Sequence, residues 1–208
     1  MLSSHGTPNL ADGVDGFNPL KDLFAAQSNR PETLGEVNLR ALSPFQRALL
    51  VIDGTVTKFI EAFTMEPVEI IRLSQKIQSL PVDHMWLEAP QGTTVVAREV
   101  LLRGKYNHWI YAYAASLVVP GRLGERENEE LEVEGEGLGR ILNQNRLETY
   151  RDILWYGREH LTSLPAAIAN IAGQAFISRT YRIIARGKPL MIINEKFPMD
   201  QDQVPSRD

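Results

Sequence analysis

The stretch ISRTYRIIARGKPLMIINEKFP, residues 177–198, consists of two strand-like runs on either side of a turn at Arg186-Gly187-Lys188-Pro189. Such runs, rich in β-branched and aromatic residues around a turn, predict a β-hairpin. A second hairpin is predicted where TTVVAREVLLRG and HWIYAYAASLVVP flank a short turn that begins at Gly104. Because the two strands of a hairpin run antiparallel, these pairs require an antiparallel sheet.

Two short helices are predicted before the strands. Ser43 is a good N-cap, and Gln46 three residues later completes a capping box for the first helix. The Asp53-Gly54 pair breaks that helix. Thr55 can cap the second helix, VTKFIEAF, so that the two form a helical hairpin.

The order of the elements predicts the fold class. RLETYRDILWYG reads as a further strand, whereas PVEIIRLSQKI is ambiguous between strand and helix. Helices followed by a run of antiparallel strands predict an α+β fold with an antiparallel β-sheet.

The 208 residues are enough for one domain with a sizeable core. Residues 1–40 are polar and rich in glycine and proline, which predicts a loosely ordered N-terminal extension. The alternative is an arm that packs on the domain through Phe17, Leu20, Leu23 and Phe24. The domain itself is expected at 41–198, followed by a polar, frayed C-terminal tail at 199–208.

The composition excludes several classes of function. A formal net charge of −4 gives no electrostatic reason to expect nucleic acid as a partner. No apolar run is long enough to insert into a membrane, and the N-terminus lacks the features of a signal peptide, so we expect a cytoplasmic protein. The seven glutamates within GERENEELEVEGEG, residues 124–137, are interpreted as a solvated surface loop or helix.

Two strands each place one charge on an otherwise apolar face. In the last strand, Glu195 points the same way as Met191, Ile193 and Phe197. In TTVVAREVLLRG, Arg98 is the only charge among Val96, Val100 and Leu102. An isolated buried charge is very costly, so each charge needs a partner. The two alternatives are an Arg98–Glu195 ion pair in the core and a closed pocket in which both charges face a ligand.

Other motifs give weaker indications of a binding or catalytic site. The glycines of VEGEGLGR do not form a dinucleotide-binding fingerprint, although a turn that enters a helix at Leu138 could offer backbone N–H groups to an anion. The chain has no cysteine, and its four histidines show no ligand spacing, so we expect no metal.

Six segments in order resemble a known family. They are DGTVTKFIEAF, AREVLLRG, ASLVVPGRL, GLGRIL, ETYRDILWYGRE and YRIIARGKPLMIINEKFP. Together they resemble the chorismate pyruvate-lyase family, also called 4-hydroxybenzoate synthases, and are most similar to its divergent branch. The resemblance covers roughly residues 43–198.

The resemblance implies a chorismate lyase-like fold, an antiparallel sheet with helices on one side and a ligand buried beneath helical flaps. By resemblance, Arg98 binds the ring carboxylate, assisted by the backbone amides of Val56 and Leu138. Glu195 matches the family glutamate that hydrogen-bonds the ring hydroxyl, as orienter or as acid/base. On this basis Arg98 and Glu195 are the catalytic candidates.

The sequence departs from the family at one position. Better-known members carry an arginine where Ser116 precedes LVVP, and that arginine is a candidate contact for the departing pyruvyl carboxylate. Arg122, Arg179 and Arg182 are the alternatives that could replace it.

The resemblance implies a cofactor-free lyase that converts chorismate to 4-hydroxybenzoate and pyruvate for quinone or phenolic-lipid biosynthesis. The alternatives are a non-catalytic effector-binding module of the same fold and a structural protein with a buried ion pair. Regulators with such modules are preceded by a DNA-binding domain, and the first forty residues are too short and polar for one.

Because the chain lacks a cluster of metal-ligating residues, we predict that lyase activity is independent of divalent ions. Turnover of chorismate should be the same with and without a chelator. Activity that disappears with the chelator and returns with a divalent ion would contradict this prediction.

Overall fold

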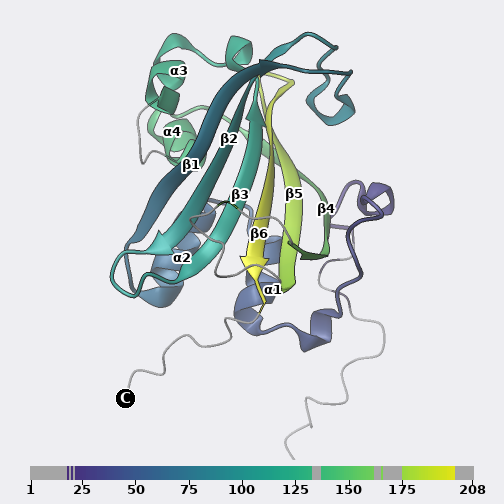
Figure 1. Ribbon diagram of the computed structural model, residues 1–208, viewed down its shortest axis with the longest axis vertical. Coiled ribbons are helices and arrows are strands. Elements are labelled where there is room, and N and C mark those ends of the chain that lie inside the picture. Colours follow the sequence, from purple (N-terminus) through teal and green to yellow (C-terminus); the bar gives the residue numbers. More distant parts are fainter. Residues whose placement is uncertain are drawn as a thin grey trace, which may run out of the picture.

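The computed structural model describes residues 18, 20, 22–132, 137–161, 165 and 175–199. A six-stranded sheet in the order β1-β2-β3-β6-β5-β4, with every described pairing antiparallel, dominates the fold (Figure 1). The strands are β1 (Val68–Ser79), β2 (Thr94–Gly104), β3 (Ile110–Val118), β4 (Tyr150–His160), β5 (Ala175–Ala185) and β6 (Lys188–Pro198). Both predicted hairpins are present, as β2–β3 and β5–β6, and the ambiguous segment forms β1.

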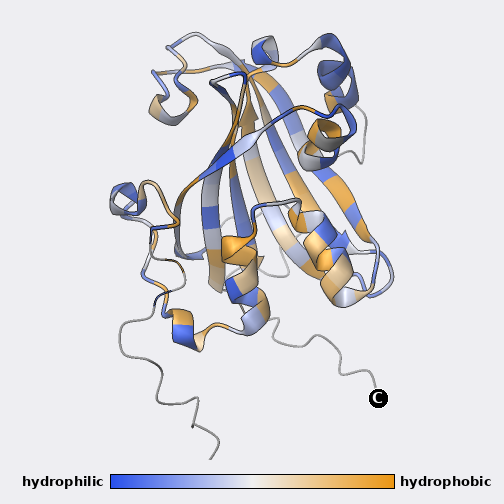
Figure 2. Cartoon of the chain, turned by 180° about the vertical axis from the view of Figure 1, so that it is seen from behind, coloured by the Kyte–Doolittle hydropathy of each residue, from blue (hydrophilic) through white to orange (hydrophobic). Residues whose placement is uncertain are grey.

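The helices lie on one side of this sheet, which confirms the predicted α+β class and layout. Figure 1 shows α1 and α2 behind the strands, and Figure 2, from the opposite side, shows them lying over the sheet with α3 and α4 toward its other end. The helices are α1 (Pro44–Val51), α2 (Val56–Thr64), α3 (Glu125–Glu132) and α4 (Leu138–Gln144). Short 3-10 turns are η1 (Gln27–Asn29), η2 (Leu39–Ala41), η3 (Met85–Leu87) and η4 (Pro120–Arg122).

The register of the sheet places both inward charges on its helix-covered face. Arg98 lies opposite Ser116, which lies opposite Ile193 on β6. Glu195, two residues along β6, lies opposite Ala114. Since paired residues of an antiparallel sheet point to the same face, Arg98 and Glu195 project from that face two strands apart.

The helical hairpin forms largely as predicted. Ser43 Oγ accepts from the Gln46 N–H at 3.2 Å, and Gln46 Oε1 accepts from the Ser43 N–H at 2.9 Å, so the capping box is complete. Thr55 precedes α2 with extended backbone, but its side chain forms no cap hydrogen bond with the helix, so that part of the prediction is wrong.

Apolar side chains from the sheet and the helices form the core on the helix-covered face. One cluster joins α3 and α4 to β5 and β6, and a second joins α1 and α2 to β2, β3 and β6. Buried members include Leu49, Val56, Ile60, Leu102, Leu131, Ile141, Leu142, Tyr181, Ile183, Ile193 and Phe197. The helices therefore enclose one face of the sheet from both ends.

The described part of the segment before the domain runs along β4. The Ala25 N–H donates to the Ile153 carbonyl at 2.8 Å, and Gly35 forms an isolated bridge with Arg158. Leu20, Leu23 and Phe24 pack against core clusters, in the manner of the packing arm considered above.

Parts of the sequence predictions lie outside the described residues, namely Phe17 with the rest of 1–17, the end of the glutamate-rich segment at 133–136, and the tail at 200–208. Within the described ranges, no helix is long and apolar enough to cross a membrane.

The capping box generates a stability prediction. Ser43→Ala removes the acceptor for the Gln46 N–H and should lower the free energy of unfolding by about 1 kcal/mol. Chemical denaturation measures this. Ser43→Asn, which retains a capping acceptor, should stay close to the wild type; an equal loss in both variants would contradict the capping role.

Candidate active site

A cavity of about 430 Å³ lies between the helix-covered face of the sheet and helices α2 and α4. That volume is within the usual range for a small-molecule site. Its lining includes the four residues expected to bind the ligand: Val56, Arg98, Leu138 and Glu195. The structure therefore brings together residues that span almost 140 positions of the chain.

Two helix N-termini meet at the cavity. Val56 is the first residue of α2, and Leu138 is the first residue of α4. A Cβ atom on Gly139 would lie only 3.2 Å from Thr55 Oγ1, so glycine permits the two helix starts to approach closely. The first N–H groups of a helix have no acceptor within the helix, which suits this corner to an anion.

Arg98 forms one wall of the cavity. Its residue is 2% exposed, and it projects from β2 beside Ser116 of β3. The Ser116 hydroxyl donates to the Arg98 backbone carbonyl at 3.4 Å. Ser116 also lines the cavity, so a small hydroxyl occupies the place where other family members are expected to have a guanidinium.

Glu195 is held by two neighbours on β5. The Arg179 Nε donates to Glu195 Oε2 at 2.9 Å, and the Tyr181 hydroxyl donates to Glu195 Oε1 at 3.1 Å. The Arg98–Glu195 ion pair considered from the sequence is wrong, because the buried partner of Glu195 is Arg179. The register explains this pairing, since Arg179 lies directly opposite Glu195.

Arg179 also binds the end of helix α1. Its side chain is 1% exposed, and Nη1 donates to the Ile52 carbonyl at 2.8 Å and to the Leu50 carbonyl at 3.4 Å. A cation is stabilised at a helix C-terminus, where the backbone dipoles leave partial negative charge. One guanidinium thus connects Glu195 to the turn of the helical hairpin.

The Tyr181 hydroxyl remains a hydrogen-bond donor. Burial raises its pKa well above the ordinary value, and the neighbouring Glu195 raises it further. The Arg179 guanidinium lies 5.1 Å from the centre of the Tyr181 ring, so the three side chains form one packed group.

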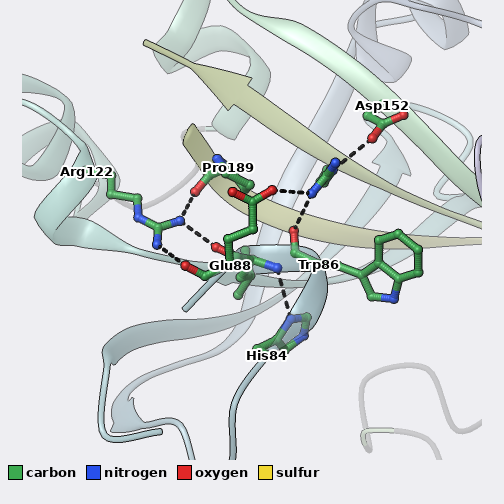
Figure 3. A network of polar contacts seen from close by, with 8 residues as sticks. His84, Trp86, Glu88, Arg122, Asp152 and Pro189 are labelled. Carbon is green, nitrogen blue, oxygen red and sulfur yellow. Dashed lines mark hydrogen bonds and ion pairs between the residues drawn. The ribbon is translucent and has the colours of Figure 1, made fainter. Parts of the chain in front are cut away.

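Arg122, one candidate to replace the family arginine, is engaged elsewhere. Its guanidinium donates to the Leu87 carbonyl at 2.6 Å, to the Glu88 carbonyl at 2.8 Å and to the Pro189 carbonyl (Figure 3). These contacts fasten the η3 turn to the start of β6. Arg122 is not part of the cavity lining.

Arg182, a second candidate, contacts three residues that are labelled in Figure 3. It donates to Asp152 Oδ2 at 2.9 Å, to Glu88 Oε1 at 3.0 Å and to the Trp86 carbonyl at 3.2 Å. Burial lowers the pKa of His84, whose Nδ1 accepts from the Leu87 N–H at 3.1 Å. Neither Arg182 nor His84 lines the cavity.

The cavity contains basic residues that the sequence analysis did not select: Lys58, Arg140 and Arg151. Arg151 shares a face of β4 with the buried Ile153, so its inward direction was readable from the alternation. Within the described part of the chain, no three His, Cys, Asp or Glu side chains are grouped so as to hold a metal ion.

A family model described as chorismate pyruvate-lyase Rv2949c-like matches residues 50–204. This chain belongs to that family. The resemblance noted from the sequence is therefore confirmed. A curated relative, the chorismate pyruvate-lyase of Mycobacterium leprae, is 26% identical over 171 residues, which cover 79% of this chain and 79% of the relative.

Solved structures with the same fold include effector domains. The effector domain of PhnF from Mycobacterium smegmatis matches with a TM-score of 0.57 and 11% identity, over 71% of this chain and 90% of that chain. A GntR-family transcriptional regulator from Bacillus cereus matches with a TM-score of 0.51 and 11% identity, over 65% and 94% respectively. At such identities the similarity shows the fold alone.

The Arg179–Glu195 pair generates a stability prediction. Arg179→Met leaves Glu195 buried without its cation and should lower the free energy of unfolding by about 3–5 kcal/mol. Adding Glu195→Gln removes the uncompensated charge, so the double variant should recover part of the lost free energy of unfolding. Chemical denaturation of the two single variants and the double variant measures the coupling.

Arg182→Met is the matched control, because its ion pairs with Asp152 and Glu88 are more exposed. It should cost less than Arg179→Met. Equal losses in the two arginine variants, or no recovery in the double variant, would contradict a central role for the buried pair.

Proposed function

We propose that this protein is a chorismate pyruvate-lyase that converts chorismate to 4-hydroxybenzoate and pyruvate. The observation that carries the proposal is the convergence of Arg98, two helix N-termini and Glu195 on one cavity. Family membership and a mycobacterial relative named for this activity support it. The proposal includes a cytoplasmic enzyme whose product enters quinone or phenolic-lipid synthesis.

In this proposal the ring carboxylate binds between Arg98 and the two helix N-termini. A guanidinium can form two parallel hydrogen bonds with a carboxylate. The backbone N–H groups of Val56 and Leu138 supply further donors, and the dipoles of two helices favour the negative charge. The near contact of Gly139 with Thr55 supports this arrangement because it holds the two helix starts together.

The ring hydroxyl then lies at Glu195. A carboxylate has about four lone-pair sites, so Glu195 can accept from the substrate while it binds Arg179 and Tyr181. Two strand spacings and an offset of two residues along β6 place the Cα atoms of Arg98 and Glu195 roughly 12 Å apart. The carboxylate and hydroxyl of the substrate are likewise at opposite ends of its ring.

The reaction requires the protein mainly to position the substrate, because no oxidant, reductant or second substrate takes part. The proton on ring carbon 4 is removed, its electron pair enters the ring, and the bond from carbon 3 to the ether oxygen breaks. Enolpyruvate leaves with that oxygen and gains a proton at its methylene carbon to become pyruvate. The ring becomes aromatic, so no oxidant or reductant is required. Fixed geometry and charge stabilisation are the contributions expected of the protein.

The alternative function is a binding module without turnover, a role suggested by the fold shared with effector domains. Incubation of the pure protein with chorismate, with pyruvate and 4-hydroxybenzoate assayed separately, distinguishes the two. The lyase should release both products in equal amounts. Chorismate that binds and is recovered unchanged would favour the binding module.

Arg98→Ala and Glu195→Gln should have different effects. Arg98→Ala removes the cation that the product carboxylate needs, so binding of 4-hydroxybenzoate should nearly disappear, with a loss of about 3–5 kcal/mol. Glu195→Gln keeps the shape but cannot accept a proton. It should bind product within roughly tenfold of the wild type, while kcat falls on the order of 100-fold if Glu195 acts as acid/base.

Titration of both variants with 4-hydroxybenzoate, alongside thermal melts and kcat measurements, tests these effects. A small fall in kcat for Glu195→Gln would assign Glu195 to orientation of the hydroxyl. If folded Arg98→Ala binds product as the wild type does, the carboxylate assignment is wrong.

A further inference from the structure

Arg151 is a buried cation of the cavity with weak resting contacts. Its side chain is 14% exposed, and it lines the cavity from β4. Among the described residues, its buried Nε has no hydrogen-bond partner. Its Nη1 lies 3.7 Å from Asp53 Oδ1, which is longer than a hydrogen bond.

This resting state is costly for a guanidinium. Arginine carries five N–H donors, and a buried donor without an acceptor loses its hydration without compensation. Asp53 offers little in return, because its side chain is 67% exposed and its attraction is screened by water. A ligand anion in the cavity would give Arg151 the acceptors that these protein contacts do not provide.

The position of Arg151 indicates which part of a ligand it would meet. Across the sheet the order is Arg98 on β2, Glu195 on β6 and Arg151 on β4. Successive members are two strands apart, roughly 10 Å measured across the sheet. Arg151 is also offset along the strands, because it lies in the row of Met191, four residues from Glu195. Arg151 lies opposite Ile183, which also lines the cavity, so it shares the face of the other two. An anion at Arg151 therefore lies on the β4 side of Glu195, whereas Arg98 lies on the β2 side.

We propose that Arg151 binds a second carboxylate, so that the cavity selects ligands with two carboxylates on opposite sides of the group that contacts Glu195. The inference rests on the proposed function, in which this second carboxylate is that of the enolpyruvyl group. That group is attached to the ring carbon next to the one bearing the hydroxyl. A carboxylate on the β4 side of Glu195 is where such a substituent extends.

The other cations are less suited to this position. Arg140 belongs to the first turn of α4, beside Leu138 at the corner proposed for the ring carboxylate. Arg179 binds Glu195 and helix α1, whereas Arg122 and Arg182 hold the η3 turn. Lys58 is 78% exposed and pairs with Glu61 at 2.7 Å. Better-known members of the family are expected to have an arginine at the position of Ser116 on β3. Arg151 would supply the missing guanidinium from β4, an edge strand of the sheet.

The test compares ligands with two carboxylates and one. Steady-state kinetics of Arg151→Met should show a KM for chorismate about 10- to 100-fold above the wild type, the range expected for hydrogen bonds to a charged group. The inhibition constant of 4-hydroxybenzoate, which lacks the second carboxylate, should stay within about twofold. kcat should change little, because the contact is the same in the ground and transition states.

Two further variants distinguish loss of the carboxylate contact from a general effect on folding or charge. Arg126→Met removes an exposed cation of α3 that does not line the cavity and should alter neither constant. Arg151→Lys keeps the charge but loses the planar fork, so its KM should lie between those of the wild type and Arg151→Met.

The outcomes separate this inference from the proposed function. If the wild type turns over chorismate but the KM of Arg151→Met is unchanged, or both ligands weaken equally, the second-carboxylate site is wrong and the lyase assignment stands. If the wild type releases no pyruvate from chorismate, both are overturned. A selective rise in KM for chorismate, graded through Arg151→Lys, supports the inference.

Discussion

The buried ion pair between Arg179 and Glu195 is the interaction on which the rest of the site depends. Removing a charge from water is very costly unless it is paired and hydrogen-bonded, and each partner here satisfies the other at 2.9 Å. Arg179 also binds the carbonyls at the end of α1. The same contact therefore orients Glu195 and anchors the helical hairpin that covers the sheet.

In the proposal, side chains and backbone N–H groups hold the small anionic ligand. The sheet supplies cations at separate strands, and the helices supply N–H groups at their first turns. Electrostatic interactions are stronger in a partly buried site than in water. An effector domain has the same fold, so the proposed chemistry is expected to depend on these particular side chains and not on the fold.

Much of the site could be read from alternation along single strands. Arg98 and Glu195 each interrupt an apolar face, and the family resemblance added Val56 and Leu138, all of which line one cavity. The same alternation places Arg179 beside Ile177 and Tyr181, and Arg151 beside Ile153, yet it does not show which strands are neighbours. Alternation therefore leaves Arg98 as a possible partner of Glu195, whereas the sheet order pairs Glu195 with Arg179.

The sequence by itself determined the local features of this protein: the capping box at Ser43, the break at Asp53-Gly54, the two hairpins and the face on which each charge lies. These depend on interactions between residues a few positions apart, which leave a period or a motif in the chain. Only the tertiary structure decided that β3 pairs with β6, that Arg179 forms the ion pair with Glu195, and that Arg151 lines the cavity from the edge strand β4. Those contacts depend on the order of strands far apart in sequence, which the burial of the whole core selects and no local pattern encodes.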